Sequence, residues 1–145
     1  MSICIKRQCY INCPPETVFA TLCDFSAYER WNPWVVAIKG SCVEGEDIAV
    51  HTKLGKKIGQ FQHRILKVDA PYVLHWCDKG WFTRLAYGER KRVLTAEGKG
   101  TQYQVMLTIS GCMSGVVKHL YGEHLEKGMT AETHALQQWV ERNHG

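Results

Sequence analysis

Residues 114–143, SGVVKHLYGEHLEKGMTAETHALQQWVERN, predict one long helix at the end of the chain. At about 100° per residue, one side of this helix collects apolar and small side chains and one histidine. The residues on that side are Met113, Val117, Leu120, Tyr121, His124, Gly128, Ala131, Ala135 and Trp139. A helix of about 30 residues is about 45 Å long, so this side must cover a broad partner. The small residues in its middle predict either close approach of a sheet or space for a small molecule.

The chain before this helix predicts an antiparallel sheet, because apolar and polar residues alternate in segments separated by short turns. The predicted strands are residues 3–12, 36–43, 48–54, 58–68, 72–77, 81–94 and 101–110. Two short helices are expected after the first strand, one starting at Pro15 and one capped by Asp24. Consecutive strands followed by a helix are typical of an α+β fold. We expect a curved sheet of about six or seven strands wrapped around the long C-terminal helix.

The composition favours one domain over residues 1–145, with a net charge of +4. The basic residues are scattered, so we expect no nucleic-acid partner. A run of about 18 apolar residues is absent, so we expect no stable membrane insertion. No signal-peptide pattern precedes the first strand, which predicts a cytoplasmic protein. The seven cysteines lack a Cys-x-x-Cys motif and are expected to be buried free thiols. We expect no cofactor, and both a monomer and a homodimer stay open.

Several short motifs resemble the SRPBCC domains of the START/Bet v 1-like superfamily. They are Pro15-x-x-Val18-Phe19, Asp24-Phe25, Trp31-Asn32-Pro33, Val68-x-x-Pro71, Leu74-x-Trp76, Gly100-Thr101 and Ser110-Gly111. Across essentially the whole chain, the order of these motifs is most similar to the polyketide cyclase/dehydrase and lipid-transport group. The resemblance implies a helix-grip fold with a hydrophobic cavity between sheet and helix. It also implies binding of lipids, sterols, polyketides or other small apolar molecules, with catalysis in a minority of members and no shared catalytic triad.

Three functions follow as hypotheses. The first is binding of a small, largely hydrophobic ligand, lipid or polyketide-like, between sheet and helix. The second is a polyketide cyclase or dehydratase, which needs an acid or base inside the cavity. The candidate catalytic residues for it are His124, Glu89 and Tyr103. The third is a START-like domain that regulates a partner protein, which predicts a filled core and an exposed apolar patch.

The predicted ligand-binding residues are aromatic side chains on strands or at the expected entrance, together with residues of the helix stripe. They are Trp34, Trp76, Trp81, Phe82, Tyr87, Tyr103, Leu120, His124 and Gly128. Arg90 and Arg92 share one strand face, which is expected to be solvated. If one of them faced the cavity instead, it would mark a functional polar centre. His51, His63 and His75 are evenly spaced, but strand parity points His51 and His75 outward, so we expect no metal site.

Overall fold

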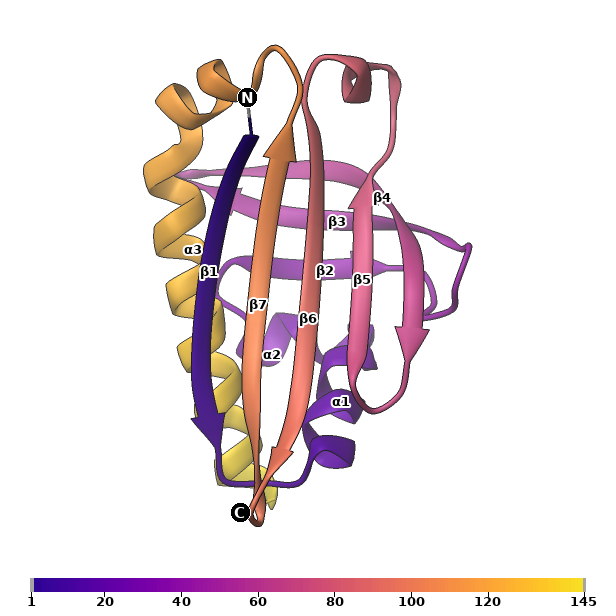
Figure 1. The fold of residues 1–145 in the computed structure, drawn as a ribbon, viewed down its shortest axis with the longest axis vertical. Helices are drawn as coiled ribbons and strands as arrows, with labels where there is room; N and C mark the ends of the chain where they lie inside the picture. The colour runs from indigo at the N-terminus through magenta and orange to yellow at the C-terminus, as the bar shows by residue number, and fades with distance from the viewer. Residues whose placement is uncertain (1, 145) are drawn as a thin grey trace.

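A long C-terminal helix lies against a curved antiparallel sheet in the computed structural model, which describes residues 2–144 (Figure 1). Within these residues the sheet has seven strands in the order β1-β7-β6-β5-β4-β3-β2. The strands are β1 (Ser2–Ile11), β2 (Val35–Lys39), β3 (Asp47–Leu54), β4 (Lys57–Asp69), β5 (Val73–Asp78), β6 (Tyr87–Glu97) and β7 (Gly100–Ser110). The helices are α1 (Pro15–Cys23), η1 (Phe25–Ala27), α2 (Tyr28–Trp31), η2 (Trp81–Arg84) and α3 (Ser114–His144). The predicted helix-grip fold is confirmed.

The sheet is a meander from β2 to β7, and its first strand is added at the far edge. β1 pairs with β7 from Ser2 opposite Ser110 to Ile11 opposite Thr101. Short turns make the other neighbours antiparallel, because a parallel pair would need a long crossover. β2 and β3 run across the direction of β1, β7 and β6, so the sheet curls strongly (Figure 1). Its concave face receives α3, and α1 and α2 lie at one end. No helix within residues 2–144 is long and apolar enough to cross a membrane.

The predicted strand over residues 81–94 is two separate elements. Residues 81–84 form the short turn η2, and strand β6 starts only at Tyr87. Gly80 opens this turn with φ of 136°, a conformation that glycine adopts without steric cost. The expectation was wrong here because aromatic residues are typical of strands but also occur in apolar surface turns. Trp81 is consequently 81% exposed.

The buried side of α3 differs from the predicted stripe. Its buried residues are Ser114, Gly128, Met129, Glu132, Thr133, Leu136 and Val140. Gly128 is buried as predicted, but Ala131, Ala135 and Trp139 are not. In each of these three places the next residue is buried instead, which is a rotation of about 100°. Leu120, Tyr121 and His124 are exposed in the first half. The prediction failed because it counted only apolar and small side chains, so a buried charged residue such as Glu132 was left out of the predicted side.

A buried ion pair links α3 to the centre of the sheet. Arg92 Nη2 donates a hydrogen bond to Glu132 Oε1 at 2.8 Å, and the two side chains are 0% and 1% exposed. Arg92 Nε donates to the Tyr103 hydroxyl at 3.2 Å, and Asn32 Nδ2 donates to Glu132 Oε2 at 2.8 Å. Burial alone would raise the pKa of Glu132, but the charges of Arg92 and Arg90 outweigh it and hold this pKa below its ordinary value. The expectation of a solvated face for both arginines was therefore wrong.

The cysteines do not all behave as buried hydrophobes. Cys13 and Cys77 are buried, whereas Cys4 and Cys112 are exposed. The free thiols of Cys23, at the end of α1, and Cys42, after β2, lie with their sulfur atoms 2.8 Å apart. These two thiols connect the short helices to the loop that follows the edge strand.

Candidate functional site

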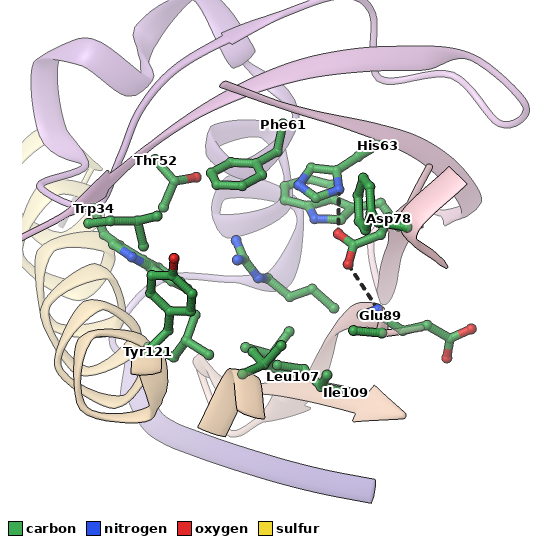
Figure 2. Close-up of a pocket in the computed structure, with 17 residues that line it drawn as sticks. Trp34, Thr52, Phe61, His63, Asp78, Glu89, Leu107, Ile109 and Tyr121 are labelled. Carbon is green, nitrogen blue, oxygen red and sulfur yellow. Dashed lines mark hydrogen bonds and ion pairs between the residues drawn. The ribbon is translucent and has the colours of Figure 1, made fainter. Parts of the chain in front are cut away.

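A cavity of about 270 Å³ lies between the concave face of the sheet and the first half of α3 (Figure 2). Its apolar walls are Trp34, Leu54, Phe61, Trp76, Phe82, Ala86, Leu107, Ile109, Val117, Tyr121 and Leu125. Its polar groups are few, namely Thr52, His63, Asp78, Gly88, Glu89 and Arg90. A mostly apolar hollow with a few polar groups is the usual form of a small-molecule site.

Strand parity explains which side chains face this cavity. On β7, Leu107 and Ile109 point inward, and on β6 the inward positions are Gly88 and Arg90. On α3, Val117, Tyr121 and Leu125 are four residues apart and share one face. Helix and sheet therefore supply opposite walls of the cavity.

Gly88 allows a carboxylate to approach the sheet. Its backbone N–H donates to Asp78 Oδ2 at 2.9 Å. A Cβ at this position would lie 2.7 Å from the same oxygen, so any other residue would displace the Asp78 side chain. The glycine thus fixes the orientation of Asp78 at the cavity wall.

Asp78 lies directly opposite His63 in the pairing of β4 with β5. His63 Nδ1 is 3.1 Å from Asp78 Oδ1, which is ion-pair distance (Figure 2). The contact lies off the direction of a ring N–H, so Nδ1 has no aligned hydrogen bond among residues 2–144. The His63 ring stacks on Trp76 with 6.3 Å between ring centres. An imidazole beside a carboxylate on a cavity wall is a combination of groups that can act in proton transfer.

Arg90 is the most deeply buried charged group of the cavity. The residue is 7% exposed, and its guanidinium carbon lies 4.4 Å from the centre of the Trp34 ring and 5.7 Å from that of Trp76. Burial lowers its pKa, although the nearby charge of Glu132 opposes this effect. Neither Nε nor Nη1 has a hydrogen-bond partner in the part of the chain that the structure describes.

Three of the predicted ligand-binding residues, Trp34, Trp76 and Phe82, line the cavity. Trp34 is buried and forms an inner wall, so it is not at the entrance. Glu89 also borders the cavity, but its carboxylate is directed away from it (Figure 2). That carboxylate accepts a hydrogen bond from the Tyr87 hydroxyl at 3.0 Å, and Tyr87 itself has the outward parity of β6.

The structure places the other predicted site residues elsewhere. Tyr103 is fully buried and binds Arg92, and burial raises its pKa, which keeps the phenol protonated. Trp81 and Leu120 are exposed, and His124 is exposed beside the β3–β4 turn at Gly55. The space above Gly128 is filled by the indole of Trp34.

Sequence reasoning missed His63 and Asp78, and it favoured solvent for Arg90. One usable signal was the alternation on β6, where Gly88, Arg90 and Arg92 share a face. The other signal needed was the register between β5 and β6. In that register Arg90 lies opposite the core residue Trp76, so both side chains are on the same face of the sheet.

Comparison with known proteins identifies the family. No curated protein sequence matches the chain. Residues 2–138 match the family described as polyketide cyclase/dehydrase and lipid transport. The chain belongs to this family. Its membership agrees with the motifs noted above and with the START/Bet v 1-like superfamily that they resemble.

Solved structures show how widely the fold of this polyketide cyclase/dehydrase and lipid-transport family member is shared. The Zhui aromatase/cyclase from Streptomyces sp. R1128 has a TM-score of 0.81 at 13% identity, covering 98% of this chain and 95% of that one. A START superfamily protein from Mycobacterium smegmatis has a TM-score of 0.72 at 18% identity, covering 96% and 97%. A norcoclaurine synthase from Thalictrum flavum has a TM-score of 0.73 at 11% identity, covering 100% and 98%. At these identities the likeness concerns the fold alone.

Proposed function

We propose that the protein binds a small, largely hydrophobic ligand in the cavity between the sheet and α3. The cavity of about 270 Å³, with its mainly apolar walls, carries this proposal. It is close to the lower end of the range for small-molecule sites, about 300–1,000 Å³. An apolar cavity of about 150 Å³ holds one benzene ring. The site therefore suits a two-ring, polyketide-like molecule better than a two-chain lipid.

Exposed apolar side chains near the first half of α3 suggest that the entrance to the cavity lies there. Tyr121 lines the cavity and is 43% exposed, so it lies between the interior and solvent. Leu120 beside it, and Trp81 and Leu85 in the η2 region, are also exposed. The backbone N–H of Met113 donates to the carbonyl of Leu85 at 2.9 Å, which holds the η2 region against the start of α3. A hydrophobic ligand would enter along these side chains.

The test is uptake of 2-naphthamide, a neutral two-ring probe, measured by isothermal titration calorimetry. We expect Val117→Trp, on the cavity wall, to weaken binding at least about tenfold, because the indole occupies the ligand's space. Val116→Trp is the matched control, since Val116 is 45% exposed and outside the cavity. Equal affinities of the two variants would contradict the proposal.

We also infer a reducing, cytoplasmic location. The seven cysteines are free, including the close pair Cys23 and Cys42. Disulfide bonds form and persist in oxidising compartments, so a chain with this many free cysteines fits a reducing one.

A second candidate function is acid–base catalysis, favoured by the contact between His63 and Asp78. These two replace His124, Glu89 and Tyr103 as candidates, because His63 and Asp78 face the cavity. In a dehydration, His63 would remove the proton next to a ketone and then give this proton to the β-hydroxyl, which would leave as water while the carbon–carbon double bond forms. Arg90 would stabilise the negative charge on the enolate oxygen.

The enzyme hypothesis is tested with an aromatic β-hydroxy ketone, followed by the absorbance of the conjugated enone. We expect the wild-type protein to exceed the rate in buffer and His63→Gln to fall to it. His124→Gln is the control, because this histidine is exposed on α3. If the wild-type protein gives only the buffer rate, the catalytic candidate is rejected and the binding proposal stands.

A further inference from the structure

We infer that the ligand carries an acidic group, most simply a carboxylate, and that Arg90 binds it. This inference rests on the proposed function and names the chemistry of its ligand. It starts from a buried guanidinium on the cavity wall whose Nε and Nη1 find no partner within residues 2–144. A buried charge without a counter-ion is costly, so its presence in a binding cavity calls for a charged partner from outside the chain.

The buried positive charge is not balanced by the acidic residues around it. Arg90 and Arg92 bring two guanidinium groups into the interior, and Glu132 is the fully buried carboxylate next to them. Both oxygens of Glu132 are already used, Oε1 by Arg92 and Oε2 by Asn32. Within the described chain, neither oxygen of Glu132 accepts a hydrogen bond from Arg90, and its single negative charge cannot balance two positive ones.

Asp78, at the edge of the cavity, is also engaged. Its Oδ2 accepts the backbone N–H of Gly88, and its Oδ1 faces His63 at 3.1 Å. Its side chain is 26% exposed, so solvent screens its attraction for Arg90. A ligand anion would therefore find Arg90 available.

The aromatic rings around Arg90 hold the guanidinium without using its N–H groups. The guanidinium lies over Trp34 at 4.4 Å and near Trp76 at 5.7 Å. Trp34 is held in turn, because Asn32 Oδ1 accepts the backbone N–H groups of Trp34 and Val35, both at 2.9 Å. A planar guanidinium supported by rings offers its edge to a carboxylate, and two parallel hydrogen bonds match that geometry.

The experiment compares two probes of equal shape, 2-naphthoate and 2-naphthamide, by isothermal titration calorimetry. We expect the wild-type protein to bind the anion at least about tenfold more tightly than the amide, as a charge-assisted hydrogen bond provides. Arg90→Met should bind the two probes equally. Lys91→Met is the matched control, because it removes the same charge from the exposed face of the same strand. It should keep the wild-type preference.

Thermal unfolding without ligand separates recognition from packing. Arg90→Met should unfold at the same or a higher temperature than the wild type, because it removes an unpaired buried charge. A lower midpoint with an unchanged preference for naphthoate would overturn the inference and give Arg90 a packing role. If Arg90→Met does not fold, the inference is still tested by whether the wild-type protein binds naphthoate more tightly than naphthamide.

The remaining outcomes distinguish the two proposals. Equal binding of both probes by the wild type, with Val117→Trp blocking both, overturns the acidic-ligand inference and leaves the proposed function intact. No binding of either probe contradicts the proposed function and the inference with it. If Lys91→Met lost the preference for naphthoate over naphthamide to the same extent as Arg90→Met, the preference would come from the overall charge of the protein, which would overturn the inference.

Discussion

Glu132→Ala should lower the free energy of unfolding by about 3–5 kcal/mol, since removing one partner leaves the other charge buried without compensation. Arg92, which is 0% exposed, would lose the carboxylate that accepts its hydrogen bond at 2.8 Å. The two guanidinium groups of Arg92 and Arg90 would then repel each other inside the protein. Asn32, which holds the backbone at Trp34, would also lose its acceptor. Urea unfolding followed by circular dichroism measures this effect.

Two control variants test whether the lower free energy of unfolding comes from the unpaired buried charge. The double variant Arg92→Met/Glu132→Leu should recover most of the stability, because apolar residues often replace a buried ion pair without loss. Glu123→Ala removes an exposed ion pair with Lys127 on the same helix and should leave the free energy of unfolding nearly unchanged. If Glu132→Ala costs no more than Glu123→Ala, the buried pair does not stabilise the fold as inferred.

The pH dependence of this difference has a definite sign. The pKa of Glu132 is held below its ordinary value of 4.5, chiefly because the charges of Arg92 and Arg90 outweigh the effect of burial. A carboxyl group with a depressed pKa in the folded state contributes its full stability above the pKa of the unfolded state. That contribution is lost as the pH falls toward the lower folded value. The stability gap between wild type and Glu132→Ala should therefore narrow below about pH 4.5.

Gly128→Ala should destabilise the protein by about 1–3 kcal/mol, the usual cost of forcing extra atoms into a packed interior. A Cβ at Gly128 would overlap the indole of Trp34, which is itself 3% exposed and has little room to move. Local helix propensity predicts the opposite sign, because alanine favours a helix interior over glycine by about 1 kcal/mol. The sign of the measured change therefore decides between local propensity and tertiary packing.

Gly122→Ala on the same helix is the matched control for this prediction. A Cβ there would meet only Lys118 Cγ, at an ordinary contact distance of 3.5 Å. This variant should gain up to about 1 kcal/mol from helix propensity. Gly128→Ala should also weaken binding of 2-naphthoate, because displacing Trp34 removes the ring that supports Arg90. Stabilisation by both variants would contradict the packing described between Trp34 and α3.

Most of the fold could be predicted because its signals are local. Alternation in residues 101–110 and the turns between strands depend on neighbours in the sequence, and together they predict the order of the elements. The buried face of α3 could not be predicted in the same way. Glu132 is inside because Arg92, on a distant strand, neutralises it, and apolar periodicity carries no information about such a partner.

The candidate site was predictable only in its aromatic part. Trp34, Trp76 and Phe82 line the cavity and were expected from residue type and position. His63 and Asp78 meet because β4 and β5 pair in one particular register. A shift by one residue would send either side chain to the opposite face, and that register follows from the assembled sheet.

The pairing of β1 with β7 has a consequence for how the chain is made. Ser2 pairs with Ser110, which is synthesised much later. β1 therefore leaves the ribosome long before β7, the strand to which it is hydrogen-bonded. At about 5–20 residues per second, this interval lasts roughly 5–20 s. During that time the edges of β1 are open to pairing with other chains. The fold therefore leaves its first strand open to such pairing until the last strand of the sheet has been synthesised.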